Sequence, residues 1–116
     1  MVAIFMDRLR AGDGVTIFGD GEQTRDFVYV GDVARAVLAA SERDGGTFNV
    51  GTGVETTVNE LFEACRSLAG AEVEAEHAPA RPGDVRRSVI DVSLAAQALG
   101  WRPSTSLDEG LRRTWG

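Results

Sequence analysis

Two kinds of apolar spacing alternate along this chain, and their alternation constrains the fold more than any other feature of the sequence. Short apolar or alternating runs predict strands at residues 15–18, 27–30, 47–50 and 73–77. Apolar residues three and four positions apart predict helices over residues 2–11, 32–41, 57–69, 93–99 and 106–115. Because strands and helices interleave, the 116 residues are expected to form one domain of the α/β or mixed α+β class.

Capping signals mark the ends of these predicted helices. Thr57 and Ser106 each stand three residues before a glutamate, which is the pattern of a capping box. Asp32 and Asp91 are expected to cap the helices that follow them. Stops are expected at Gly12, 44–46, Gly70 and Gly100. The helix over 32–41 is expected to have an apolar face formed by Val33, Ala36, Val37 and Ala40.

Charge and composition argue against several classes of function. The net charge is −6 and no basic run exceeds two residues, so neither nucleic acid nor an anionic membrane is the expected partner. The sequence has no apolar run of about 18 residues that would predict a membrane span. Cys65 is the only cysteine, which excludes an internal disulfide and a cysteine-built zinc site. We expect a cytoplasmic protein without a metal site.

The residues alone do not assemble a catalytic site. Glycine pairs occur at 12/14, 19/21 and 51/53, but none of them continues into the motif G-x-G-x-x-G that binds dinucleotide phosphates. The chain has no lysine, so no lysine can act as a base or form a Schiff base. Cys65 lies on an apolar helix face and His77 in a predicted strand, which indicates structural roles for both.

Two arginines are set in turns that could aim them at an anion. Arg25 follows the Gly-Asp-Gly turn at 19–21, and Arg81 and Asp84 lie in the run Arg-Pro-Gly-Asp. An arginine fork forms paired hydrogen bonds with phosphate oxygens, and a nearby carboxylate accepts hydrogen bonds from sugar hydroxyls. The set therefore suits a nucleoside diphosphate linked to a sugar. By spacing alone, surface ion pairs with Asp26 or Asp84 explain the same arginines equally well.

Three strings carry a resemblance to a known family: FGDGEQTRDFVYVGDVARA, then FNVGTG, then RPGDVRRSVIDVSLAAQALGWRPSTSLDEGL. In this order and spacing they resemble the C-terminal part of the extended short-chain dehydrogenase/reductases. Within that group the chain is most similar to the NAD-dependent sugar-nucleotide epimerases and dehydratases, typified by UDP-glucose 4-epimerase. The resemblance implies that residues 1–116 form a nucleotide-sugar-binding domain of a Rossmann-type epimerase, without the Rossmann dinucleotide loop.

The resemblance also implies roles for individual residues. Arg25 and Arg81 would contact the diphosphate of a UDP-sugar, and Asp84 would reach the ribose. Residues of the string VTIF would line the nucleobase and sugar side, although plain core packing explains them equally well. These softer candidates are Val15, Ile17 and Phe18.

The implied reaction is the interconversion of UDP-glucose and UDP-galactose through a 4-keto intermediate. NAD would be bound by a domain absent from this chain, and we expect no cofactor on the chain itself. The family's Tyr-x-x-x-Lys pair is missing, since Tyr29 is the only tyrosine and lysine is absent. We therefore expect no catalytic residues and no activity in the chain alone. A nucleotide-sugar dehydratase or decarboxylase, or a non-catalytic binding module, remains an open alternative. Uncovered apolar residues favour a homodimer of the isolated chain.

Overall fold

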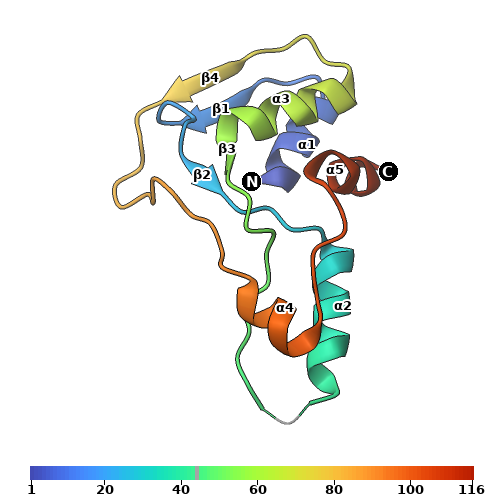
Figure 1. The fold of residues 1–116 in the computed structure, drawn as a ribbon. Helices are drawn as coiled ribbons and strands as arrows, with labels where there is room; N and C mark the ends of the chain where they lie inside the picture. Colours follow the sequence, from blue (N-terminus) through green and yellow to red (C-terminus); the bar gives the residue numbers. More distant parts are fainter. Residues whose placement is uncertain (44) are drawn as a thin grey trace.

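In residues 1–43 and 45–116, which the computed structural model describes, five helices and four short strands form two parts, one above the other in Figure 1. The upper part, here called the sheet half, contains α1 (Val2–Arg10), β1 (Val15–Phe18), α3 (Val58–Ala69), β4 (Ala75–Ala78) and α5 (Leu107–Trp115). The lower part, here called the helical arm, contains α2 (Val30–Ser41) and α4 (Ser93–Leu99). The short strands β2 (Thr24–Arg25) and β3 (Thr56–Thr57) lie between the two parts.

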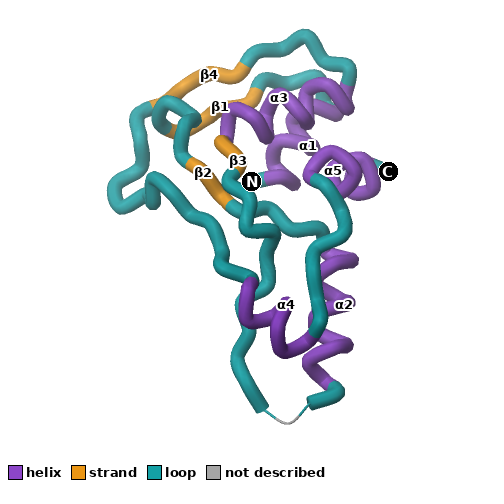
Figure 2. The backbone as a smooth tube through the Cα atoms, viewed as in Figure 1, coloured by secondary structure: helices purple, strands orange, loops and turns teal. Residues whose placement is uncertain are grey.

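Both sheets have two strands. β1 and β4 run parallel, with Val15 opposite Ala75 and Phe18 opposite Ala78. β2 and β3 run antiparallel, with Arg25 opposite Thr56. Figure 2 shows that a long loop, residues 79–92, leads from β4 down to α4 along the side of β2. None of the described helices exceeds 12 residues, and none is long and apolar enough to cross a membrane.

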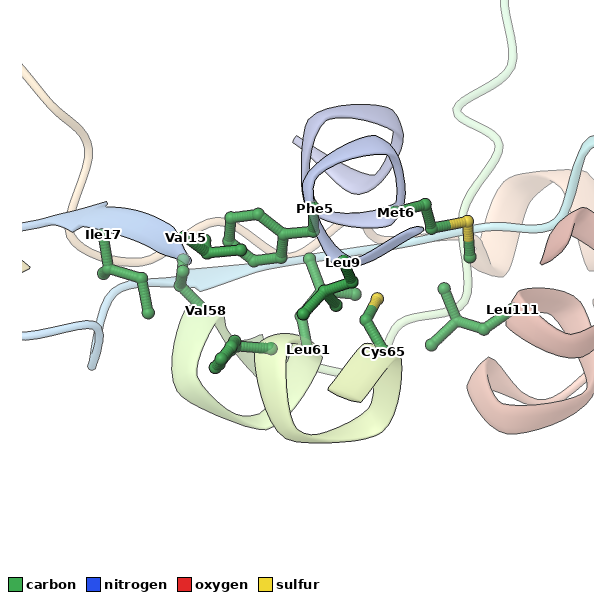
Figure 3. Packing of buried hydrophobic residues seen from close by; sticks show 10 residues of the cluster. Phe5, Met6, Leu9, Val15, Ile17, Val58, Leu61, Cys65 and Leu111 are labelled. Carbon is green, nitrogen blue, oxygen red and sulfur yellow. The ribbon is translucent and has the colours of Figure 1, made fainter. Parts of the chain in front are cut away.

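The core of the sheet half is an apolar cluster between α1, β1, α3 and α5. Figure 3 shows α1 and α3 facing each other across it, with Leu61 and Cys65 of α3 pointing inward. The Phe5 and Phe62 rings meet edge to face, with centroids 6.1 Å apart. Each large apolar side chain buried in this way stabilises the fold by about 1.5–3 kcal/mol. The buried members are Phe5, Met6, Leu9, Val15, Ile17, Val58, Leu61, Phe62, Cys65 and Leu111.

The predicted capping box of α3 is confirmed in full. The Thr57 hydroxyl accepts a hydrogen bond from the Glu60 N–H, and the Glu60 carboxylate accepts one from the Thr57 N–H. Gly70 then ends α3 in the left-handed conformation, at φ +62°. The second box forms only in half, because the Ser106 hydroxyl accepts from the Glu109 N–H while the Glu109 carboxylate pairs with arginines of the next turn.

Two predicted strands are wrong. Residues 27–29 form a loop, and Val30, the end of the predicted strand, is the first residue of α2. Residues 47–50 are also irregular. Their apolar side chains Phe48 and Val50 pack instead against a small cluster of Ala36, Ala95 and Trp101. The last predicted strand is present but displaced, at Ala75–Ala78 rather than 73–77. The predicted stop at 44–46 begins on a residue outside the described ones.

Asp32 and Asp91 are not the N-caps that the sequence predicts. Tyr29 is the N-cap of α2, so Asp32 lies inside the first turn. Val92 is the N-cap of α4, and Asp91, one residue earlier, accepts hydrogen bonds from the Ser93 N–H and hydroxyl.

The predicted apolar face of α2 is covered only in part. Ala36 is 2% exposed, as expected for a core position, but Val37 is 62% exposed. Val33 and Ala40 are half-buried.

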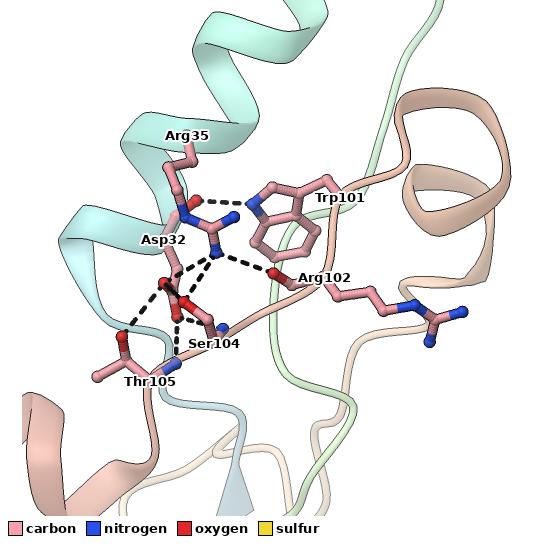
Figure 4. A network of polar contacts seen from close by, with 6 residues as sticks. All are labelled: Asp32, Arg35, Trp101, Arg102, Ser104 and Thr105. Carbon is pink, nitrogen blue, oxygen red and sulfur yellow. Dashed lines mark hydrogen bonds and ion pairs between the residues drawn. The ribbon is translucent and has the colours of Figure 1, made fainter.

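Asp32 joins α2 to the chain beyond α4, as Figure 4 shows. Its buried carboxylate accepts hydrogen bonds from the backbone N–H groups and the hydroxyls of Ser104 and Thr105, and from Arg35. The Asp32 carbonyl accepts a further hydrogen bond from the Trp101 indole at 2.9 Å. The carboxylate therefore acts as a tertiary clamp that fixes the helical arm to the irregular segment leading into α5.

Candidate functional site

A groove of about 310 Å³ on the sheet half collects residues from four separated segments of the chain. The start of α1 and the end of β1 supply apolar walls. β2 and the 79–92 loop supply the charged groups. The lining residues are Met1, Ile4, Phe5, Thr16, Ile17, Phe18, Gln23, Arg25, Val58, Arg81 and Asp84.

Arg25 is held rigidly at one side of this groove. Its Nη1 donates to the carbonyls of Thr24 and Val85, at 2.6 and 2.7 Å. Its Nη2 donates to Asp84 Oδ1 at 2.7 Å, and the Arg25 side chain is 24% exposed. These contacts use three of the five guanidinium N–H groups, so two remain for a ligand.

The run Arg-Pro-Gly-Asp forms a tight turn that places two charged side chains at its ends. The Asp84 N–H donates to the Arg81 carbonyl at 3.2 Å, and Gly83 has φ +79°. Proline at the second position and a positive-φ glycine at the third are the signature of a type II turn. From its two ends, Asp84 reaches Arg25, and the Arg81 guanidinium lies over the Phe18 ring at 3.9 Å.

This arrangement differs from the surface pairs that the sequence left open. Arg25 pairs with Asp84, 59 positions away, and not with its neighbour Asp26. The Asp26 carboxylate instead accepts the N–H groups of Thr52, Gly53 and Ile90, and the Thr52 hydroxyl. Burial alone would raise the pKa of Asp26, but these hydrogen bonds outweigh burial and lower it. Asp26 therefore stays ionised and clamps the Gly-Thr-Gly turn to the 79–92 loop.

Two further ion pairs fasten the 79–92 loop along its length. The Arg86 fork binds both oxygens of Asp20, at 2.7 and 2.9 Å, and lowers the pKa of that carboxyl to about 2 together with the Glu22 N–H. The Arg87 fork binds Glu55 in the same way, which lowers the pKa of Glu55. A single exposed ion pair contributes little to the free energy of unfolding. Here the two pairs together tie the 79–92 loop to the chain beside β2.

In two of the three glycine pairs, 19/21 and 51/53, one glycine lies close against other parts of the chain. A Cβ at Gly21 would overlap the Asn59 side chain, and Gly21 has φ +78°. A Cβ at Gly51 would lie 3.0 Å from an Asp26 oxygen and from Ile90. Gly21 and Gly51 therefore permit close packing within the chain, and neither pair continues into the G-x-G-x-x-G motif.

Five of the six predicted binding residues line the groove, and one does not. Ile17, Phe18, Arg25, Arg81 and Asp84 are brought together there. Val15 is 2% exposed in the core cluster and does not line the groove.

The sequence reasoning did not single out the groove residues Met1, Ile4, Phe5, Thr16, Gln23 and Val58. Ile4 could have been found, because it is apolar and yet lies off the buried face of α1, with 62% of it exposed.

Cys65 and His77 have structural surroundings. Cys65 is fully buried in the core cluster, and burial raises the pKa of its thiol to about 11, which keeps it protonated and unreactive. His77 contacts the Gly19 carbonyl through Nδ1 at 2.8 Å and so fastens the turn after β1.

The fold and the groove define a class: a mixed α/β portion with a groove, lined in part by Arg25 and Arg81, beside a parallel strand pair. The model of the family described as GDP-mannose 4,6 dehydratase matches residues 2–114, so the chain belongs to this family. Its sequence is 48% identical over 116 residues to the UDP-glucose 4-epimerase of Mycolicibacterium smegmatis. That alignment covers 98% of this chain and 37% of the relative.

Two solved structures have the same fold. The UDP-glucose 4-epimerase of Thermotoga maritima, solved with UDP-glucose, superposes with a TM-score of 0.94 at 50% identity, covering 98% of this chain and 37% of that one. The UDP-glucose 4-epimerase of Thermus thermophilus, solved with NAD, gives a TM-score of 0.90 at 43% identity, covering 98% and 38%. The chain thus spans little more than a third of these relatives, matching their C-terminal portion.

Proposed function

We propose that residues 1–116 are the nucleotide-sugar-binding domain of a UDP-glucose 4-epimerase. The observation that carries the proposal is the groove, where Arg25, Arg81 and Asp84 converge from segments 59 positions apart. The relative from Thermotoga maritima, similar over almost the whole chain, was solved with UDP-glucose. Both facts support a diphosphate-linked sugar as the ligand.

Five of the groove residues have a role in this proposal. The two N–H groups left on Arg25 and the guanidinium edge of Arg81 bind the diphosphate oxygens. Asp84 uses one oxygen to hold Arg25, which leaves the second oxygen to accept a hydrogen bond from a ribose hydroxyl. Phe18 borders the groove on the nucleobase and sugar side, and Ile17, 2% exposed in the core cluster, packs behind this wall. The free energy of binding the diphosphate, which does not react, then holds the sugar in place for the reaction.

The redox step of an epimerase is proposed to lie outside this chain. NAD supplies reversible hydride transfer when it is bound, and the Thermus thermophilus relative was solved with it. None of the glycine pairs of this chain completes the G-x-G-x-x-G motif, so in this proposal residues 1–116 bind the substrate and the rest of a longer protein carries out hydride transfer. Epimerisation of UDP-glucose through a 4-keto sugar is the activity proposed for that protein.

Calorimetric titration with UDP tests this function. The unmodified chain is expected to bind, and Arg25→Ala is expected to lose about 1.5–3 kcal/mol, or roughly tenfold to 150-fold in affinity. Arg112→Ala is the matched control, because Arg112 is also ion-paired, with Glu109, but lies on α5 and does not line the groove. Equal losses in the two variants, or no binding by the unmodified chain, would contradict the proposal.

GDP-mannose dehydration is the second candidate, because the matching family model carries that description. Both substrates contain a diphosphate that must be bound, so the arginines do not distinguish the epimerase from the dehydratase. Competition between UDP-glucose and GDP-mannose for the same groove does. A preference for UDP-glucose supports the epimerase, and a preference for GDP-mannose supports the dehydratase.

A further inference from the structure

Arg81 is held differently from the other arginines around the groove. It lies in the 79–92 loop, outside any helix or strand. Within residues 1–43 and 45–116, no hydrogen bond or ion pair engages its guanidinium, and its one aromatic contact is the Phe18 ring at 3.9 Å. Arg25, Arg86 and Arg87 each spend N–H groups on a carboxylate.

Phe18 is a fixed platform for this contact. It is the last residue of β1, opposite Ala78 in the parallel pairing. Its carbonyl accepts a hydrogen bond from Gln23 Nε2 at 2.9 Å, and the next N–H, of Gly19, donates to the Ala78 carbonyl at 2.7 Å. The backbone that carries the ring is therefore tied to β4 on one side and to the Gln23 side chain on the other.

The mode of contact decides what Arg81 can still bind. A guanidinium stacked on a ring is held by its face, while its N–H groups point outward from its edge. Arg25, by contrast, has already used three of its five donors. Arg81 therefore brings all five donors to the groove. Stacking on Phe18 also restricts the rotamers of the Arg81 side chain before a ligand binds. Less side-chain entropy is therefore lost on binding.

We propose that Phe18 is a positioning residue, whose ring holds the Arg81 guanidinium over the groove with its donor edge free for the ligand's phosphates. This inference rests on the proposed function, since it takes Arg81 to be a diphosphate ligand. It gives Phe18 a role that acts through Arg81, distinct from direct contact with the nucleobase.

The experiment combines UDP affinity with a double-mutant cycle. Phe18→Leu is expected to weaken UDP binding by about threefold to tenfold, the scale of a partly exposed cation–π contact. Phe18→Tyr keeps a ring and is expected to restore the affinity. In an Arg81→Ala background, Phe18→Leu is expected to have no further effect. Phe48→Leu is the matched control, because Phe48 also faces an arginine, Arg43 at 5.6 Å, but lies in the helical arm.

A second measurement needs no ligand. In ¹⁵N relaxation, the Arg81 Nε–Hε group is expected to be ordered in the unmodified chain and mobile in Phe18→Leu. Phe18→Met, which keeps apolar volume without a ring, replaces the leucine variant if the latter does not fold. An unchanged Arg81 order parameter, or an equal loss of affinity in both arginine backgrounds, overturns the positioning role alone. Absence of UDP binding by the unmodified chain overturns the proposed function as well.

Discussion

Replacing Asp32 with alanine is expected to destabilise the fold more than any exposed substitution. The Asp32 carboxylate is 2% exposed and accepts the N–H groups of Ser104 and Thr105, at 3.1 and 3.0 Å. In Asp32→Ala both N–H groups lose their acceptor in a part-buried position, and each such loss costs about 1–3 kcal/mol. The Arg35 guanidinium also loses one acceptor, but it keeps the Arg102 carbonyl and the Ser104 hydroxyl and is 49% exposed.

Together these losses predict a decrease of about 3–5 kcal/mol in the free energy of unfolding. That is a large part of the total for a domain of this size, which is about 5–15 kcal/mol. Urea denaturation followed by circular dichroism measures it. Asp91→Ala is the control, because Asp91 makes similar hydrogen bonds to Ser93 but is exposed to water. If the two variants lost equal stability, the clamp in Figure 4 would not stabilise the arm as described.

The same clamp predicts the sign of a pH effect. Burial alone would raise the pKa of Asp32, but hydrogen bonds from Arg35, Thr105 and Ser104 outweigh it and lower the pKa. The unfolded chain then binds the proton more readily than the folded one. The stability from Asp32 is complete above its ordinary pKa of about 3.9 and is lost as pH falls through the lower folded pKa. The difference between the unmodified chain and Asp32→Ala is therefore expected to shrink in acid.

Three shorter predictions concern the turn, the activity and the assembly. Gly21→Ala is expected to destabilise the chain more than Gly12→Ala, because both have positive φ but only Gly21 faces another side chain; equal melting shifts would contradict this. The purified chain is expected to show no epimerase turnover, and a measurable rate would overturn the proposed division of labour. Val30, Val37 and Leu38 of α2 are 62–71% exposed, so light scattering is expected to show self-association; a monomer of 12.4 kDa at high micromolar concentration would refute it.

Features that depend on neighbouring residues could be predicted from the sequence. The capping box at Thr57, the glycine stop at Gly70 and the turn at 81–84 each depend on four or five consecutive residues. Asp32 shows where this reasoning ends. An aspartate near a helix start is favourable both at the N-cap and in the first turn, so the local sequence does not choose between them. The backbone N–H groups that donate to the Asp32 carboxylate lie 72 and 73 positions away.

The same limit applies to the candidate site, where the sequence predicts residues but not their contacts. The sequence identifies Arg25, Arg81 and Asp84 as residues of interest, but not which of them meet. Asp84 reaches Arg25 because the loop runs beside β2, and Arg81 reaches Phe18 because β1 and β4 pair in parallel. Residues 47–50 have a strand-like composition, but in the structure they pair with no strand and their apolar side chains pack into the helical arm.

Mapping UDP onto the chain by ¹H–¹⁵N chemical shifts tests the central claim most directly. A larger cavity of about 720 Å³ lies in the helical arm, between Thr52 and Pro103. The measurement therefore distinguishes UDP binding in the groove from UDP binding in this cavity. The account predicts that the largest shift changes fall on the amides of Ile17, Phe18 and Arg25 and on residues 81–84. Changes centred on the arm cavity, or none at millimolar UDP, would contradict it.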